Sequence, residues 1–237
     1  MSPGDQTHEV DHAISDRATH LTPPGPSCRG ARRGRDRDLG RKRLAQDQKN
    51  AVERGAWIVF FDESGLSLTP TVRRSWAPIG QTPVLEHRFN WKRASMAAAL
   101  CYPPNPDDRR TPEVAFHVQY DSYNTETLIE VLDELRTFLA PQPVTLIWDG
   151  LPAHRSKAMT AFLATQADWL TVERLPAYAP DLNPVEALWS SVKGVELANL
   201  CPGTIDEAIT CAQHGIDRVR ATEHLPYSFL QHTGLSL

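Results

Sequence analysis

The first 56 residues of this 237-residue chain contain no aromatic residue, because all 18 Trp, Tyr and Phe residues lie at Trp57 or beyond. Residues 1–50 also show no sustained helical or alternating pattern of apolar residues. A segment without large apolar side chains rarely offsets the entropy that a chain loses on folding. We therefore expect residues 1–50 to be a disordered basic arm and residues 51–237 to form one folded domain.

The chain also lacks a strong net charge, which is formally −4, but its charge is unevenly divided. Residues 1–50 carry +3 and the remainder carries −7, and most arginines of the arm lie between Arg29 and Arg43. Such a run either binds polyanions or stays solvated, and both interpretations remain open. An acidic body is unusual for a simple nucleic-acid-binding module, unless its acidic residues bind metal ions.

The four cysteines form no CxxC pair and are too few and scattered for a disulfide framework. No apolar run approaches the length of a membrane span, and the N-terminus lacks the apolar region of a signal peptide. These absences argue against a disulfide-rich secreted protein and against a membrane protein. We expect a soluble cytoplasmic protein without a membrane partner.

Apolar periodicity predicts an α/β domain. The order is three strands, then helix, strand, helix, strand and helix, which gives a mixed five-stranded sheet flanked by helices. The predicted strands cover residues 56–64, 94–100, 113–120, 144–148 and 169–175, and the predicted helices cover residues 125–139, 157–166 and 184–198.

Two predicted strands deliver an aspartate at their carboxyl end. Asp62 follows the apolar segment "WIVFF", and Asp149 follows "VTLIW". If the two strands are neighbours in one sheet, the two carboxylates lie side by side. Glu63 follows Asp62 directly and should point to the opposite face of the strand, so we leave it outside this group.

A third carboxylate, Glu186, lies at the third position of the helix that Asn183 is expected to cap. A glutamate there can simply return a hydrogen bond to the cap residue, and this alternative stays open. Three carboxylates can instead hold Mg²⁺, which prefers oxygen ligands. A pair of such ions promotes in-line attack on a phosphodiester, so the pattern indicates metal-dependent phosphoryl transfer.

The segments "FFDESG", "WDGLPAHRS" and "YAPDLNPVEALWSSVKG" together resemble the DDE transposases of bacterial insertion sequences in the mariner superfamily, from about Trp57 to Leu200. The 36 residues between Asp149 and Glu186 are close to the family's usual interval. The resemblance implies a ribonuclease-H-like fold in which Asp62, Asp149 and Glu186 are catalytic and bind Mg²⁺ or Mn²⁺. It implies cleavage and strand transfer at transposon ends, with end and target DNA as partners and a homodimer in the active complex.

The resemblance also suggests supporting residues. His154 and Asn183 occupy motif positions near the acids and are expected to orient them or the scissile phosphate; an ordinary residue at a helix start is the alternative for His154. Trp76 or Trp91 could pack against sugar or base, with core tryptophans in a solvated basic hairpin as the alternative. The candidates for contacts to DNA phosphates are Arg73, Arg74, Arg88, Lys92 and Arg93.

The arginine- and proline-rich arm departs from the family, whose members carry helix-turn-helix modules ahead of the catalytic domain. We expect a truncated or altered N-terminal region with no intact helix-turn-helix. A catalytically inactive fragment that binds DNA or a partner protomer is therefore the alternative function. A sugar hydrolase with paired carboxylates is a third and weaker one, because no aromatic sugar-binding pattern surrounds the aspartates. The resemblance places the protein in a bacterial cytoplasm, on the nucleoid when it is bound to DNA.

Overall fold

A five-stranded sheet forms the centre of the computed structural model, which describes residues 28–86, 92–105, 110–176 and 180–235, with side chains from residue 39 onward. The strand order is β3-β2-β1-β4-β5. Antiparallel pairing joins β1 to β2 and β2 to β3, whereas β1, β4 and β5 run parallel, so the predicted mixed sheet is confirmed. The strands are β1 (Trp57–Ser67), β2 (Arg93–Tyr102), β3 (Glu113–Tyr120), β4 (Val144–Trp148) and β5 (Leu170–Arg174).

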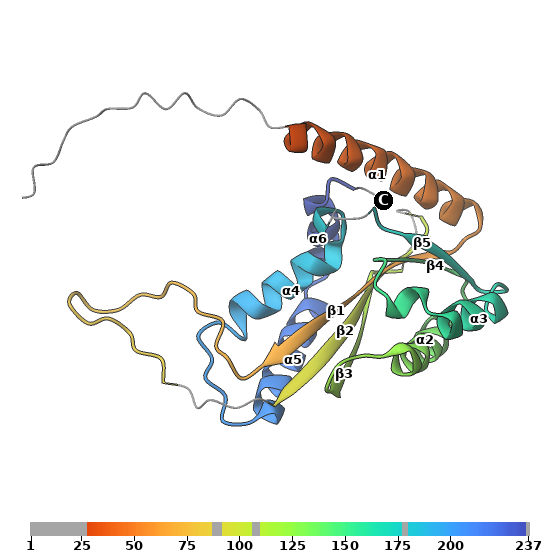
Figure 1. Cartoon of the computed structure of the whole chain (residues 1–237). Coiled ribbons are helices and arrows are strands. Elements are labelled where there is room, and N and C mark those ends of the chain that lie inside the picture. Colours follow the sequence, from red (N-terminus) through yellow and green to blue (C-terminus); the bar gives the residue numbers. More distant parts are fainter. Residues whose placement is uncertain (1–27, 87–91, 106–109, 177–179, 236–237) are drawn as a thin grey trace, which may run out of the picture.

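Helices cover both faces of the sheet (Figure 1), with α2 and α3 on one side and α4, α5 and α6 on the other. No helix among the described residues is long and apolar enough to cross a membrane. The helices are α1 (Cys28–Glu53), α2 (Thr125–Leu139), α3 (Lys157–Thr165), α4 (Pro184–Val195), α5 (Ile205–Arg220) and α6 (His224–His232), and the short 3-10 helices are η1 (Ala153–Arg155) and η2 (Pro180–Leu182).

Alternation along β1 divides the core into two clusters. Ile58 and Phe60 pack among residues of α4, α5 and α6, whereas Val59 and Phe61 pack among residues of α2 and α3. All five residues of β4 are buried, as expected for a parallel strand covered on both faces. Each large side chain buried here contributes about 1.5–3 kcal/mol, so the sheet is a firm platform for the loops at its edge.

The predicted strands and the helices α2, α3 and α4 are present with shifts of a few residues at their ends. One prediction is wrong: Asp62 does not end its strand. β1 continues to Ser67 because it stays paired with β2, and Asp62 lies opposite Ala98 in that ladder. The parallel pairing of β1 with β4 stops at Phe60, so Asp62 still lies beside the carboxyl end of β4.

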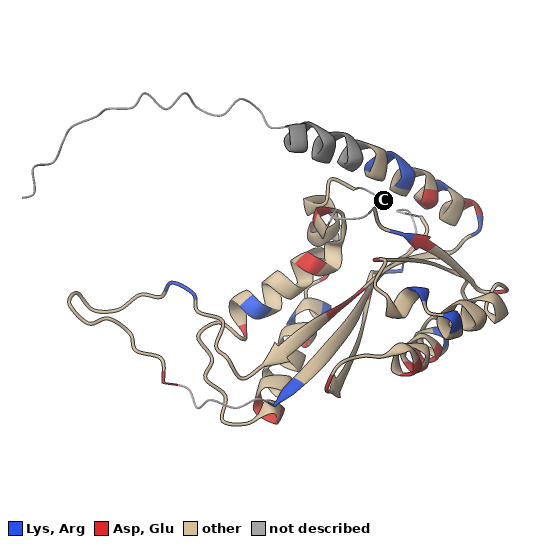
Figure 2. Ribbon diagram, viewed as in Figure 1, with Lys and Arg blue, Asp and Glu red and all other residues tan. Residues whose placement is uncertain are grey.

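The prediction of a disordered arm is also wrong for residues 28–50, which belong to α1. Gly40, Leu44, Asp47 and Ala51 are buried and follow helical spacing, so this side of α1 packs on the domain. A Cβ at Gly40 would lie 2.7 Å from Cγ of Pro176, which explains the glycine at this close approach. The opposite side of α1 is exposed and carries basic residues (Figure 2). Residues 1–27 lie outside the described residues.

Candidate active site

Three carboxylates from three different elements line one hollow of about 630 Å³. Asp62 comes from β1, Asp149 directly follows β4, and Glu186 lies in the first turn of α4. The parallel neighbours β1 and β4 present the two aspartates at the same edge of the sheet. The hollow has the volume of a typical ligand site, so the fold brings the three predicted acids together around a usable space.

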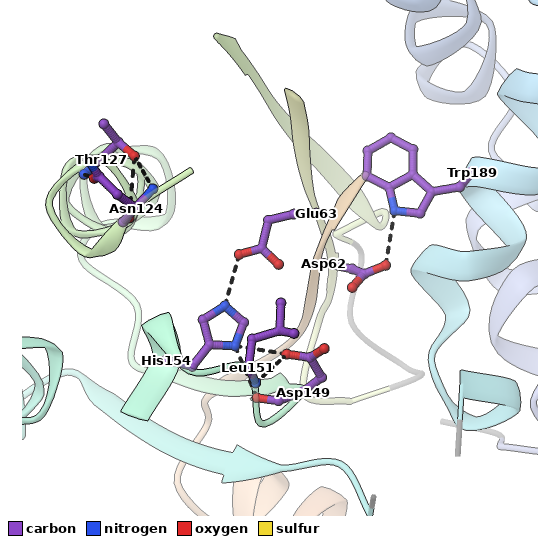
Figure 3. A network of polar contacts seen from close by, with 8 residues as sticks. All are labelled: Asp62, Glu63, Asn124, Thr127, Asp149, Leu151, His154 and Trp189. Atoms are coloured by element: carbon purple, nitrogen blue, oxygen red, sulfur yellow. Dashed lines mark hydrogen bonds and ion pairs between the residues drawn. The ribbon is translucent and has the colours of Figure 1, made fainter. Parts of the chain in front are cut away.

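The carboxylate of Asp149 is held by one of its two oxygens (Figure 3). Oδ1 lies 2.9 Å from Nδ1 of His154 and accepts a hydrogen bond from the backbone N–H of Leu151 at 3.1 Å. Within the described part of the chain, Oδ2 accepts no hydrogen bond. Partial burial favours the neutral acid, but the bonds from His154 and Leu151 outweigh it and lower the pKa of Asp149 below its usual value. Asp149 is therefore an ionised carboxylate with one free oxygen.

His154 lies in η1 and is buried, with 1% of its side chain exposed. Its ring stacks on Trp148 at 4.0 Å between centroids, and its Nε2 lies 2.8 Å from Oε1 of Glu63. Nδ1 lies 3.1 Å from the backbone oxygen of Asp149 as well as near its carboxylate. Burial opposes the charged ring, but hydrogen bonds to Asp149 and Glu63 outweigh it and raise the pKa of His154 to about 9. These contacts favour the supporting role over an ordinary helix-start residue.

Asp62 is in a different environment. Its Oδ2 accepts a hydrogen bond from Nε1 of Trp189 at 3.1 Å. Burial, together with the negative charges of Glu186 and Glu63, raises the pKa of Asp62 to about 7, and the bond from Trp189 acts in the opposite direction. Crowding of this kind is relieved by a cation, which favours the charged form of each carboxylate.

Asn183 caps α4, because its side-chain oxygen accepts a hydrogen bond from the backbone N–H of Val185 at 3.2 Å. The backbone N–H of Asn183 donates to the backbone oxygen of Pro180, so Glu186 is not its capping partner. Glu186 is exposed, and no hydrogen bond reaches its carboxylate from the described residues. The reciprocal capping hydrogen bond of Glu186 is therefore absent among the described residues, whereas its place in the first turn still suits the helix dipole.

The donor set suits Mg²⁺ or Mn²⁺, since carboxylate oxygens are the ligands that hard divalent cations prefer. Among the described residues, one oxygen of Asp62 and one oxygen of Asp149 accept no hydrogen bond, and Figure 3 shows these two oxygens turned toward each other. However, no three His, Cys, Asp or Glu side chains of the described residues lie close enough to hold an ion as they stand. A third ligand thus requires a side-chain movement, which the exposure of Glu186 permits.

Further residues at the site had not been predicted. Trp189 and Lys193 lie three and seven positions after Glu186, and this helical spacing on one face of α4 is the signal that could have found them. Nζ of Lys193 donates to Oγ of Ser64 at 2.6 Å, and burial lowers the pKa of Lys193.

Two arginines, Arg155 and Arg174, are exposed and line the hollow beside the carboxylates. Neither belongs to an ion pair within 4 Å among the described residues. Arg155 directly follows His154 in the quoted motif, whereas no sequence signal indicates Arg174.

The described residues among the predicted DNA contacts do not line the hollow; they belong to the segment that joins β1 to β2 (Figure 1) or to the start of β2. Trp76 on this segment is 99% exposed, so the core alternative is wrong for it. Arg88 and Trp91 fall outside the described residues. The four described candidates, all exposed, are Arg73, Arg74, Lys92 and Arg93.

A family model described as DDE superfamily endonuclease matches residues 57–200. No curated protein matches the chain. Among solved structures, the chain is similar to the Mos1 transposase paired-end complex with left transposon end, with 18% identity, a TM-score of 0.59, and 93% of this chain and 63% of that chain covered. The chain is also similar to the Mos1 strand transfer complex, with 19% identity, a TM-score of 0.55, and 94% of this chain and 67% of that chain covered. For the Mos1 mariner paired-end complex with Mn, the identity is 18%, the TM-score is 0.57, and 92% of this chain and 64% of that chain are covered.

This chain thus spans less than two thirds of the length of the first of these chains. At such identities the likeness shows the fold, and it confirms the predicted ribonuclease-H-like architecture.

Proposed function

Because the chain belongs to the DDE superfamily of endonucleases, we propose that it is the catalytic domain of a transposase, which cleaves DNA at transposon ends and transfers the freed strand to target DNA. The observation that carries this proposal is the meeting of Asp62, Asp149 and Glu186 at one hollow. Similar solved structures are a paired-end complex with a transposon end and a strand transfer complex, which supports DNA as the partner.

In this proposal Asp62, Asp149 and Glu186 hold Mg²⁺ or Mn²⁺. A bound pair of divalent cations supplies the positive charge that activates the attacking hydroxyl and stabilises the leaving oxygen in an in-line displacement. Similar solved structures are complexes with Mn and with Mg, which supports either ion. The residues around the carboxylates fix them beforehand: Trp189 holds one oxygen of Asp62, and His154 holds one oxygen of Asp149.

Arg155 and Arg174 give the hollow a positive rim. Each guanidinium can donate hydrogen bonds to phosphate oxygens, which positions a DNA strand without reading its sequence. These two arginines would offset the repulsion between the phosphate and the carboxylates. We therefore propose that they bind the phosphates nearest the cleaved bond.

Contacts farther along the DNA are assigned to the exposed basic residues outside the hollow. A transposon has two ends, so a homodimer with one end at each protomer is the arrangement that we propose for the active complex, and the paired-end complexes of similar structures support it. The residues assigned to these outer contacts are Arg73, Arg74, Arg88, Lys92 and Arg93.

The test is nicking of a supercoiled plasmid that carries the DNA flanking the gene, with Mg²⁺ or Mn²⁺. We expect Asp149→Asn to lower the nicking rate by at least about 10³-fold, as for other residues that act as one catalytic unit. Asp168→Asn is the matched control, because Asp168 is an exposed aspartate paired with Arg136. Equal nicking by the parent and Asp149→Asn would contradict the proposal. Retained DNA binding without Mn²⁺ binding would instead indicate the catalytically inactive fragment.

A further inference from the structure

Glu63 is an acidic residue of β1 that faces away from the three carboxylates of the hollow. It follows Asp62, so strand alternation turns its side chain to the side of the sheet that α2 and α3 cover. Only 13% of this side chain is exposed. Its Oε1 accepts a hydrogen bond from His154, and its buried Oε2 has no partner among the described residues. Because a buried carboxylate with an unsatisfied oxygen costs free energy, packing alone does not account for Glu63.

His154 lies between Glu63 and Asp149 and contacts both carboxylates (Figure 3). The imidazole is restrained from three directions: Trp148 stacks on its face, Glu63 bonds Nε2, and Asp149 bonds Nδ1. A ring with both nitrogens bonded and one face covered cannot turn without losing these contacts. Nδ1 therefore stays directed at Oδ1 of Asp149.

The fixed ring of His154 makes the two carboxylate oxygens of Asp149 unequal. Oδ1 is engaged by His154 and by the N–H of Leu151, so Oδ2, which has no partner in the described part of the chain, is the oxygen turned toward Asp62. If the ring of His154 were free to rotate, the carboxylate of Asp149 would lose its stronger restraint and could turn either oxygen to the hollow. The orientation of Asp149 thus depends on a residue of another strand, on the other side of the sheet.

We propose that Glu63 is a positioning residue of this site: through His154 it fixes the carboxylate of Asp149 with one oxygen directed into the hollow. Glu63 acts as a hydrogen-bond acceptor and not as a ligand of a cation. The effect on cation binding and on DNA cleavage rests on the proposed function, whereas the restraint of the ring does not.

Two substitutions of Glu63 distinguish its role as a hydrogen-bond acceptor from the other contributions of its side chain. Glu63→Ala removes the acceptor of Nε2, and Glu63→Gln keeps an oxygen acceptor of nearly the same shape. Glu196→Ala is the matched control, because Glu196 is 15% exposed, lies 2.6 Å from Nε of Arg218 and does not line the hollow. It shows what the loss of a similarly buried, paired carboxylate costs elsewhere in the protein.

The first measurement is the NMR spectrum of the imidazole N–H groups in metal-free, ¹⁵N-labelled protein, with the signals of His154 identified by their loss in His154→Gln. We expect two slowly exchanging ring protons of His154 in the parent, in Glu63→Gln and in Glu196→Ala, and their loss in Glu63→Ala. Unprotected ring protons in the parent, or protected ones in Glu63→Ala, would overturn the proposal.

The second measurement is Mn²⁺ affinity by calorimetry together with the kinetics of DNA nicking. We expect Glu63→Ala to weaken Mn²⁺ binding and lower kcat by about 10–100-fold with an unchanged KM for DNA, as for residues that orient metal ligands. Glu63→Gln should stay within about fivefold of the parent, because a neutral acceptor keeps part of a charge-assisted bond. Parental values for folded Glu63→Ala, or equal losses in Glu63→Gln and Glu63→Ala, would contradict positioning by a hydrogen bond.

The two proposals fail in different ways. A parent protein that neither binds Mn²⁺ nor nicks DNA refutes the proposed function. The ring protons of His154 still decide whether Glu63 fixes the imidazole, because that spectrum requires neither metal nor DNA.

Discussion

Asp62 lies inside β1 and Asp149 directly follows its parallel neighbour β4, yet their surroundings act on these two aspartates in opposite directions. Asp149 lies against the charged ring of His154, which lowers its pKa. Asp62 accepts its hydrogen bond from the neutral indole of Trp189, and burial and the nearby Glu186 raise its pKa to about 7. Burial and nearby carboxylates raise the pKa of Asp62, whereas the hydrogen bonds that Asp149 accepts outweigh its burial, so the surroundings of each carboxylate decide its charge.

The opposite pKa shifts of Asp62 and Asp149 suggest that the two carboxylates contribute differently to cation binding. Asp149 is ionised throughout the pH range of the cell and offers a constant negative charge. Asp62 becomes fully charged only above neutral pH, or when a cation offsets the carboxylates around it. In the proposed cation site, we therefore expect the pH dependence of cation binding to come mainly from Asp62.

The largest effect that we expect from the difference between the two aspartates is a strong pH dependence of Mn²⁺ affinity. Asp62 must lose its proton to bind a cation, so we expect the affinity to fall about tenfold for each pH unit below 7. Asp149, whose pKa is lowered, and His154, whose pKa is about 9, stay charged between pH 5.5 and 7 and add no slope. Calorimetric titration from pH 5.5 to 8 measures the slope, and a flat profile would remove the distinction between the two aspartates.

The substitution Trp189→Phe should change Mn²⁺ affinity by a smaller factor, and it acts on Asp62 but not on Asp149. It keeps an aromatic ring but removes the N–H that stabilises charged Asp62, so the pKa of Asp62 should rise further. We expect Mn²⁺ affinity at pH 7 to weaken about three- to tenfold and the pH profile to move upward. Trp169→Phe is the control, since the indole of Trp169 donates to the amide oxygen of Gln166, away from the hollow. Equal losses in the two variants would indicate a packing effect.

The smallest expected effect is a pair of Tm shifts of opposite sign in metal-free protein at pH 8. The raised pKa of Asp62 contributes stability below its unfolded value near 4, and this stability is lost as the pH rises through about 7. At pH 8 charged Asp62 costs stability, so Asp62→Asn should raise Tm. The lowered pKa of Asp149 contributes stability above its unfolded value, so Asp149→Asn should lower Tm.

Each of these Tm shifts should correspond to about 1 kcal/mol, a figure that allows for solvent screening of the 40% exposed Asp149, or about 2–4 °C for a chain of this size. Differential scanning calorimetry of the two variants beside the parent measures them. Shifts in the same direction would contradict the opposite environments of the two aspartates.

Strong local patterns account for what the sequence could predict. β4 is a run of five apolar residues, and α2 repeats its apolar residues at helical spacing after a cap at Asn124, so both were found within a residue of their ends. The helix α1 was missed because Gly40 and Asp47 interrupt its buried stripe, leaving Leu44 and Ala51 as a weak signal. The helices α5 and α6 were not predicted, although both bury apolar residues against the sheet.

The acids of the site could be predicted because each stands in a local motif. Their hydrogen bonds could not, because they join residues far apart in the chain: Glu63 meets His154 across 91 positions, and Asp62 meets Trp189 across 127. The extension of β1 beyond Asp62 likewise depends on its pairing with β2. Such partners become neighbours only when the sheet and its covering helices assemble.

The proposed function requires Asp62, Asp149 and Glu186 to form a cation site. Anomalous diffraction at the manganese absorption edge, from crystals grown with Mn²⁺, tests it most directly. We predict a peak within about 2.1–2.3 Å of the free oxygens of Asp62 and Asp149, with Glu186 turned toward it, and no peak in Asp149→Asn. No peak at saturating Mn²⁺, or a peak away from these two oxygens, would show that the three acids do not form this site.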